Sequence, residues 1–389
     1  MKSFSGLSRS TFLLALSSFF ADISTEMLYP ILPLFLTQTL GASVSRVGVI
    51  EGLAPAIQNV VQGLSGWLSD KLQRRKQIAL IGYSIAAVSK PLTALATSWT
   101  GVLGARSLDR FGAGTRSAPR DALVAGSVAD ADRGKAFGLE GFGDNLGACL
   151  GPLLAVALLA LFGASLRAIF VVAFVPGALA AVMVVFVRER RSVAVSTVKL
   201  DRDVARLPRD YRKALAAIAI FGVGNSSNSF LVLRTRALGA SVTTTIVIYA
   251  AFNFVAALSS YPAGHLSDSL GRKGALVLCL VLFCVAYGGI ALTSNLALLS
   301  VLFAVYGLEQ GAFRSVGKAL ATDLAPEGLR ATAVGWYTAT LGVTGLVASV
   351  VGGELWTRFG ASATFALGAT SALAGSVAVV LLVPRTTAA

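Results

Sequence analysis

The chain is poor in the residues on which most enzymes depend for catalysis. Its 389 residues include one histidine, His265, and three cysteines. Cys149, Cys279 and Cys284 lie in apolar runs without the CxxC spacing of zinc sites. No GxxxxGK motif followed by Ser or Thr, the signature of a nucleotide-binding P-loop, occurs. We therefore expect no enzymatic activity, no metal and no cofactor.

Charged residues are also scarce. They make up 13% of the chain, whereas soluble domains carry about 25%. Hydrophobic residues reach 55%. The length accommodates about twelve spans of roughly 20 apolar residues, each with a short connection. These proportions exclude a soluble protein and indicate a polytopic membrane protein.

Apolar runs between short polar or Gly/Pro clusters predict twelve transmembrane helices. The first six are expected at residues 11–37, 44–69, 78–97, 100–128, 135–161 and 166–187. The other six are expected at 214–238, 243–267, 275–294, 296–323, 331–357 and 362–383. We predict an all-α protein with an N-terminal half (1–187), a linker (188–213) and a C-terminal half (214–389).

The net charge of +14 has an explanation in membrane topology. Basic residues concentrate in the linker and in the loops on the side of the N-terminus, including Lys2, Arg9, Lys76, Arg272 and Arg330. Such loops face the cytoplasm, so we expect both termini there, in the inner (plasma) membrane. The expected partners are the lipid bilayer, protons and a small-molecule substrate. Nucleic acid is not needed to explain the charge, and we expect a monomer.

The two halves repeat one another. Six residues of the loop after the second span recur at a shift of 198 positions. They are Gly66, Leu68, Ser69, Asp70, Leu72 and Arg74, matched by Gly264, Leu266, Ser267, Asp268, Leu270 and Arg272. Arg116, Ser117 and Arg120 likewise recur as Arg314, Ser315 and Lys318. Because the shift spans an even number of helices, the repeat is a parallel one, as in some transporters.

This loop resembles the signature of the major facilitator superfamily of secondary transporters, and the resemblance covers essentially the whole chain. Gln73 stands where the family prefers Gly, and Ser269 stands at a basic position. The resemblance implies a cytoplasmic gate, although the basic residues could also serve only to fix topology. The gate residues it implies are Gly66, Asp70, Arg74, Arg75, Gly264, Asp268, Arg272 and Lys273.

The fifth predicted span carries a second signature. Gly138, Gly147, Gly151 and Pro152 match the motif that the family's drug/proton antiporters carry. Ala155 and Val156 replace the final glycine pair of that motif. The match favours export, while small residues also occur wherever helices pack closely.

The fourth predicted span is unusually charged. Arg106, Asp109 and Arg110 share one face of it, and charges inside a membrane mark a pathway, a relay or a paired network. Asp22 and Glu26, one turn apart on the first span, are expected at a similar depth. Burial and a neighbouring arginine act on such a carboxylate in opposite senses. We predict proton coupling through these residues, the alternative being a static salt bridge.

Further polar residues fall within the spans. Glu140 and Asp144 are expected to pair with Arg116 and Arg120 in a structural or gating network. Candidate substrate contacts are polar residues of the second half, each of which could equally bridge two helices. They are Asn225, Asn228, Tyr249, Asn253, Glu309 and Tyr337.

Together these features predict a proton-coupled secondary transporter that moves a small organic molecule by alternating access. Export by antiport is the first hypothesis. The alternative is proton-coupled import of a small, possibly anionic metabolite, given Arg106 and Arg110. A membrane sensor without transport is a third hypothesis, which the two gate loops argue against.

Overall fold

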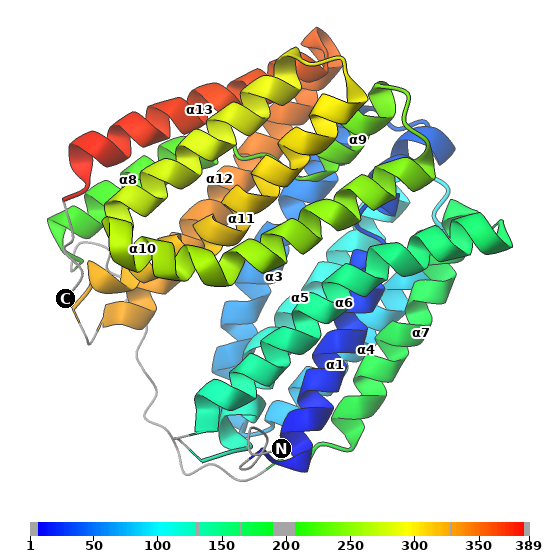
Figure 1. The fold of residues 1–389 in the computed structure, drawn as a ribbon. Helices are drawn as coiled ribbons and strands as arrows, with labels where there is room; N and C mark the ends of the chain where they lie inside the picture. The colour runs from blue at the N-terminus through cyan, green and yellow to red at the C-terminus, as the bar shows by residue number, and fades with distance from the viewer. Residues whose placement is uncertain (1–6, 130–131, 164, 190–206, 327–328, 385–389) are drawn as a thin grey trace. The chain divides into compact units, whose positions relative to one another are not determined.

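The computed structural model describes residues 7–129, 132–163, 165–189, 207–326 and 329–384 (Figure 1). These residues form thirteen α-helices and one short π-helical segment, η2. Each predicted span coincides with one helix, with consecutive short helices, or with part of a longer one. The prediction of an all-helical architecture is confirmed.

The helices up to the linker begin with a broken span. α1 (Arg9–Glu26) is followed by α2 (Ile31–Leu34) and η2 (Phe35–Thr39). Ser8 caps α1 by accepting a hydrogen bond from the backbone N of Thr11 at 3.2 Å. The remaining helices before the linker are α3 (Val44–Leu72), α4 (Arg75–Leu95), α5 (Trp99–Gly126), α6 (Arg133–Phe162) and α7 (Leu166–Val185).

The helices after the linker include one that covers two predicted spans. α8 (Arg209–Gly222) and α9 (Ser229–Ala237) form the first span, and α10 (Val242–Leu292) forms the next two. A non-helical residue, Gly271, kinks α10 between its two arms. The last helices are α11 (Leu296–Asp323), α12 (Arg330–Phe359) and α13 (Ala361–Leu382).

The chain packs into two compact units. One comprises residues 1–42 and 53–197, and the other comprises 43–52 and 198–389. In the first unit α4 packs against α5 and α7, and α1 packs against α6 and α7. In the second unit α10 packs against α11 and α13, and α13 also contacts α8. The first residues of α3 therefore belong to the second unit, and the rest of α3 belongs to the first. The half boundaries expected from sequence stay a prediction.

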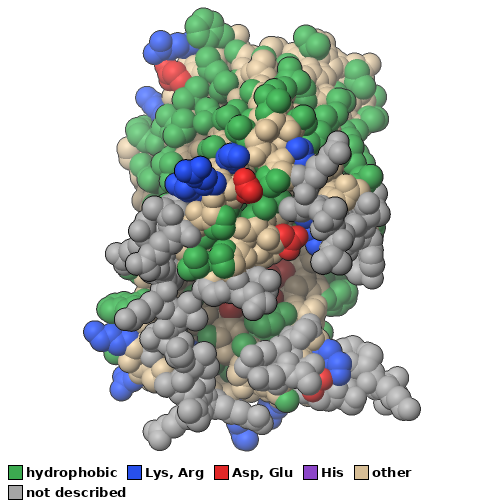
Figure 2. All heavy atoms as spheres, turned by 90° about the vertical axis from the view of Figure 1, so that its left-hand side faces the viewer, with side chains coloured by type: hydrophobic (Ala, Val, Ile, Leu, Met, Phe, Trp, Pro, Cys, Tyr) green, Lys and Arg blue, Asp and Glu red, His purple; other side chains and the backbone are tan. Residues whose placement is uncertain are grey.

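Many apolar side chains face outward. Leu95 is 74% exposed and Leu292 is 88% exposed, and hydrophobic side chains are widespread on the face drawn in Figure 2. Among the described residues, nine helical segments are long and apolar enough to cross a membrane. α5 is not one of them. Its charges, and how they are compensated, define the site described below.

The two copies of the loop signature share a positive φ at the same position. Gly271 has a φ of 74° and Gln73, its counterpart in the first copy, has a φ of 53°. Gln73 is the one residue other than glycine with a positive φ in the described chain. This conformation crowds the Cβ atom of any residue except glycine. The turn therefore explains why glycine suits this position, and Gln73 is strained there.

We expect the Gln73→Gly variant to be more stable than the parent by about 0.5–1 kcal/mol, because relief of the left-handed strain outweighs the added freedom of the unfolded chain. Reversible unfolding in mixed micelles would measure the difference. Gln77→Gly is the matched control, since Gln77 lies within α4, and it should lose about 1 kcal/mol. Equal losses in both variants would contradict the strain.

Candidate functional site

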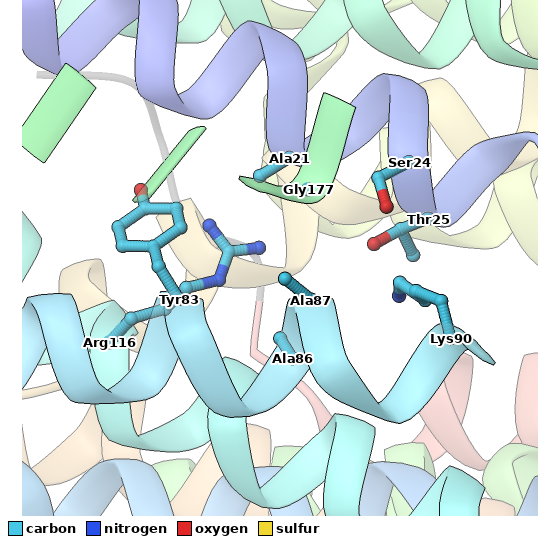
Figure 3. Close-up of a pocket in the computed structure, with 9 residues that line it drawn as sticks. All are labelled: Ala21, Ser24, Thr25, Tyr83, Ala86, Ala87, Lys90, Arg116 and Gly177. Carbon is cyan, nitrogen blue, oxygen red and sulfur yellow. The ribbon is translucent and has the colours of Figure 1, made fainter. Parts of the chain in front are cut away.

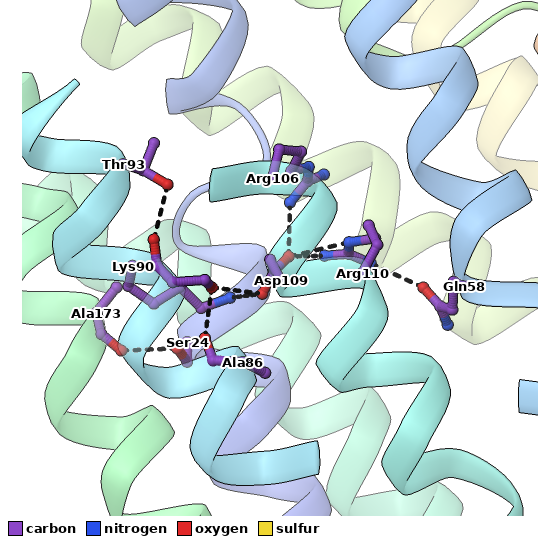
Figure 4. A network of polar contacts seen from close by, with 10 residues as sticks. Ser24, Gln58, Ala86, Lys90, Thr93, Arg106, Asp109, Arg110 and Ala173 are labelled. Carbon is purple, nitrogen blue, oxygen red and sulfur yellow. Dashed lines mark hydrogen bonds and ion pairs between the residues drawn. The ribbon is translucent and has the colours of Figure 1, made fainter. Parts of the chain in front are cut away.

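Asp109 is the centre of a buried ionic cluster in the first unit (Figure 4). Its Oδ1 lies 2.6 Å from Nζ of Lys90 on α4. Its Oδ2 lies 3.2 Å from Nη1 of Arg106 and 2.8 Å from Nη2 of Arg110, both on α5. Lys90 and Asp109 are 3% and 4% exposed. One carboxylate thus contacts three cations, and Arg110 also donates to Gln58 on α3 at 3.1 Å.

Two glycines bring α4 and α5 close enough to form this cluster. A Cβ added to Gly82 would lie 2.7 Å from the backbone O of Gly112. A Cβ added to Gly112 would lie 2.6 Å from the backbone N of Ala86. Such distances are shorter than side-chain contacts allow, so only glycine permits this helix spacing. Lys90 reaches Asp109 because the backbones of the two helices touch.

A second ionic cluster joins α5 to α6. Arg120 Nη1 lies 2.9 Å from Glu140 Oε1 and 3.9 Å from Asp144 Oδ1. Ser18 of α1 donates to Glu140 Oε1 at 2.8 Å and accepts from Arg120 Nη1 at 3.0 Å. The expected pairing of Glu140 and Asp144 with Arg120 is therefore present. Whether this cluster acts as a gate stays a prediction.

Asp22 differs from these acids because no described residue forms a hydrogen bond or an ion pair with it. It is partly buried on α1. Arg116 and Arg120 are the cations that act most strongly on its charge, and Glu26 and Glu140 are nearby acids. The sequence led us to expect Arg106 and Arg110 as partners of the α1 acids. Both arginines contact Asp109 on their own helix, and their pairing with the α1 acids stays a prediction.

The α6 glycines pack directly against the acidic part of α1. A Cβ on Gly147 would lie 2.5 Å from the backbone O of Phe19 and 3.0 Å from Cβ of Asp22. A Cβ on Gly151 would lie 2.8 Å from the backbone N of Met27 and 3.1 Å from Cβ of Glu26. Pro152 is buried beside them. A Cβ on Gly138 would meet no atom of the described residues outside its own helix within 4 Å. Two of the motif's glycines thus set the distance between α6 and both acids.

Arg116 lines a small pocket between α1, α4, α5 and α7 (Figure 3). Its guanidinium carbon lies 4.5 Å from the centre of the Tyr83 ring, an arrangement typical of a cation–π contact. Its Nε and Nη1 atoms are buried and have no hydrogen-bond partner within the described chain. The expected pairing of Arg116 with Glu140 or Asp144 is not formed. Lys90 lines the other end of the same pocket.

The gate residues make contacts within their own units where they are described. The backbone N atoms of Arg75 and Lys76 donate to the carboxylate of Glu189 at 2.9 and 3.2 Å, while Arg74 precedes α4. Gly66 approaches Ala118 on α5, with 3.2 Å from its added Cβ. Arg272 Nε lies 2.9 Å from Asp323 Oδ2, and Lys273 Nζ donates to the backbone O of Val383 at 2.6 Å. Asp70 lies in α3, and Gly264 and Asp268 lie in α10. The contacts of these three residues are outside what the structure describes.

The candidate substrate contacts of the second unit are only partly brought together. Tyr306 donates to Asn228 Oδ1 at 2.7 Å, and Asn228 Nδ2 donates to Gln310 at 3.2 Å. The Tyr249 ring packs against Phe252 in a tilted arrangement, with ring centres 5.7 Å apart. Tyr337 belongs to a buried apolar cluster with Tyr211 and Ala333.

The other three candidates of this unit differ in burial. Glu309 is 2% exposed. Asn253 is partly buried, and its Nδ2 has no hydrogen-bond partner within the described chain. Asn225 lies between α8 and α9. A substrate role for these residues stays a prediction.

Sequence reasoning missed three side chains that make polar contacts in this region. Lys90 neutralises Asp109, Ser18 bridges Arg120 and Glu140, and Glu189 caps the start of α4. A single lysine in an apolar run was a usable signal for Lys90, because an isolated ammonium in a span needs an anion. Ser18 and Glu189 carried no comparable signal.

Comparison with known proteins gives the class to which this fold and site belong. The family model of the Major Facilitator Superfamily matches residues 14–232 and 214–389. The chain therefore belongs to this superfamily. It is a multi-pass membrane protein and a secondary transporter of a small molecule, and not an enzyme.

Individual relatives agree with this assignment. An uncharacterised MFS-type transporter of Methanocaldococcus jannaschii is 34% identical over 94% of this chain and 93% of its own length. A probable 4-methylmuconolactone transporter of Cupriavidus pinatubonensis is 29% identical over 97% of this chain and 91% of its own length. The crystal structure of a mutant of the nucleoside transporter NupG superposes with a TM-score of 0.83 at 15% identity, covering 96% of this chain and 100% of that one. This last similarity is one of fold.

Proposed function

We propose that the protein is a proton-coupled exporter in which Asp22 exchanges the coupling proton. The observation that carries this proposal is the environment of Asp22. It is a carboxylate within a membrane-spanning helix, close to Arg116 and Arg120 but bonded to no described side chain. A membrane-embedded acid without a fixed partner is suited to a proton relay.

The other acids of α5 and α6 suit a static role better. Asp109 contacts Lys90 at 2.6 Å and two arginines, and Glu140 contacts Arg120 at 2.9 Å. Protonation of Asp109 would remove the carboxylate that Lys90 and both arginines contact, which is strongly unfavourable. Protonation of Glu140 would remove one of the carboxylates that Arg120 contacts, beside Asp121 at 2.9 Å. We infer that these acids hold the helices together while Asp22 changes its protonation state.

Export is supported by the α6 glycines. They match the antiporter motif of the family, and they place α6 directly against Asp22 and Glu26. A change of charge at Asp22 that displaces α1 would therefore also displace α6, since close-packed helices transmit small displacements. The substrate is a small organic molecule, and 4-methylmuconolactone, named for one relative, is a reasonable first compound to test.

Import of an anion by proton symport is the second candidate. It is favoured by the Asp109 cluster, in which Lys90 and Arg110 alone carry two positive charges against one carboxylate. An importer would carry its anion and the proton in the same direction, so the two candidates predict opposite solute movement.

Proton movement in everted membrane vesicles tests the proposal. A thermal-shift screen on purified protein first selects compounds that bind. Respiration then acidifies the vesicle interior, and a pH-sensitive dye follows the gradient. We expect a bound compound added outside to release protons, because an antiporter exchanges it for internal protons. Vesicles without the protein serve as the control.

Two results would contradict export. A compound that accumulates in right-side-out proteoliposomes under an inward proton gradient, with no proton release from everted vesicles, would indicate symport. A compound that crosses proteoliposome membranes at the same rate with and without a protonophore would show that transport is not coupled to protons.

A further inference from the structure

Arg116 is exceptional among the cations embedded in the first unit. Lys90, Arg106, Arg110 and Arg120 each form an ion pair with a carboxylate. The guanidinium of Arg116 forms none with any described residue, and its buried Nε and Nη1 atoms lack hydrogen-bond partners. Arginine is charged at all relevant pH values. A guanidinium held in a membrane span without an acceptor calls for a ligand that supplies one.

Tyr83 covers one face of the Arg116 guanidinium without bonding to its buried Nε and Nη1 atoms. Tyr83 lies 4.5 Å from the guanidinium carbon and faces the planar cation. A ring over the face of the guanidinium does not accept its in-plane N–H bonds, so the contact with Tyr83 leaves these donors unsatisfied. Tyr83 is itself fixed, since its hydroxyl pairs with Ser17 Oγ at 3.1 Å. The tyrosine therefore holds Arg116 in place without satisfying it.

The pocket beside Arg116 is suited to negative charge. Nine residues line it, and Lys90 and Arg116 are charged while none of the nine is acidic (Figure 3). Ser24 in its wall donates to the backbone O of Ala173 at 2.6 Å, so its proton is not available. The space admits roughly one water-sized particle. An acidic group of a solute would therefore enter only if the side chains around this space shift.

Asp22 is the acid with which an incoming anion would compete. Arg116 acts on the charge of Asp22, yet the two side chains are not joined by a hydrogen bond or an ion pair in the described chain. One alternative is that Arg116 binds no ligand and acts only as a distant counter-ion to Asp22. That arrangement would leave the guanidinium donors unsatisfied, which buried polar groups in proteins rarely are.

We propose that Arg116 binds the carboxylate, or another oxyanion group, of the transported solute, so that the substrate is a small organic anion. Arginine suits this role because its planar donors match the two oxygens of a carboxylate. Lys90 lines the same pocket, although its charge is already paired with Asp109 at 2.6 Å. This inference rests on the proposed function, and it names the chemical class of the substrate.

The test uses the full-length protein purified in detergent. Its melting temperature is measured with increasing sodium propanoate, with sodium chloride at equal ionic strength, and with propanamide as the neutral isostere. We expect propanoate to raise the melting temperature in a saturable manner, and neither chloride nor propanamide to match it. Failure of propanoate to stabilise the parent protein would overturn the inference.

Substitutions locate the binding site. Arg116→Gln is expected to weaken propanoate binding at least tenfold, and Arg116→Lys to give an intermediate affinity, because lysine keeps the charge without the planar donors. Arg209→Gln, at an exposed arginine in the first turn of α8, is the matched control and should bind propanoate normally. Equal binding by Arg116→Gln and the parent would place the anion elsewhere and overturn the inference. If Arg116→Gln does not fold, the Lys variant carries the test.

The remaining outcomes separate this inference from the proposed function. An equal, Arg116-dependent effect of chloride and propanoate would identify an inorganic-anion site and overturn the assignment to the substrate. Proton-coupled transport of a neutral solute that does not compete with propanoate would leave the function intact and refute the anionic substrate class. Arg116-dependent binding of propanoate without any proton-coupled flux would support the anion site and refute the function.

Discussion

The Asp22→Asn variant is expected to lose the proton release that substrate evokes in everted vesicles. Removal of a side chain that transfers protons typically lowers a rate by a factor of about 100 or more. Asparagine has nearly the shape of aspartate but cannot exchange a proton. Since Asp22 is bonded to no described side chain, its replacement breaks no hydrogen bond or ion pair with a described residue, and the fold and melting temperature should change little.

Two further variants make this prediction specific. Asp22→Glu keeps the ionisable group and should retain part of the coupled flux. Asp210→Asn removes an acid that is exposed at the start of α8 and faces Lys213 at 3.5 Å, and it should behave like the parent. If Asp22→Asn keeps the full proton-coupled flux, another group carries the proton and our proposal for Asp22 is wrong.

Replacement of Asp109 should affect stability more than any other single change in the first unit. Asp109→Asn leaves Lys90, Arg106 and Arg110 without the carboxylate that all three contact. Removal of one partner from a buried ion pair costs about 3–5 kcal/mol. Unfolding in mixed detergent micelles, followed by circular dichroism, should show a loss of this size.

A double variant separates charge from packing. Lys90→Met removes one cation and keeps a side chain of similar volume, so Asp109 still faces two arginines and the loss should be smaller. Combined with Asp109→Asn, it should recover part of the lost stability, because one uncompensated charge is gone. A loss below about 1 kcal/mol for Asp109→Asn, on a scale where buried pairs give several, would mean that water reaches the cluster and screens it.

The helices and the general position of the charges followed from the sequence. Apolar runs are long, and their boundaries are marked by polar or Gly/Pro clusters, so each predicted span found its helix. The i, i+3 and i+4 spacing of Arg106, Asp109 and Arg110 correctly predicted a shared face. The glycine motif of the fifth predicted span, which is α6 in the structure, likewise identified Gly147 and Gly151, which contact α1.

Partners across helices could not be predicted in the same way. Lys90 and Asp109 meet because Gly82 and Gly112 bring two backbones together, and a glycine within a helix does not reveal which neighbour it faces. The rotation of α5 about its axis decides that Asp109 meets Lys90 of α4 and that Arg116 rests on Tyr83. This rotation depends on packing against α3 and α4 together, which spacing along one helix does not encode.

The shared left-handed turn at Gln73 and Gly271 bears on the history of the chain. Two six-helix segments with the same motif at a constant offset are what duplication and fusion of one gene produce. A positive φ is kept in both copies although only one has glycine there, so this backbone feature persists where the residue best suited to it is absent. The N-terminal copy thus carries a small, permanent conformational cost that the surrounding helices are stable enough to absorb.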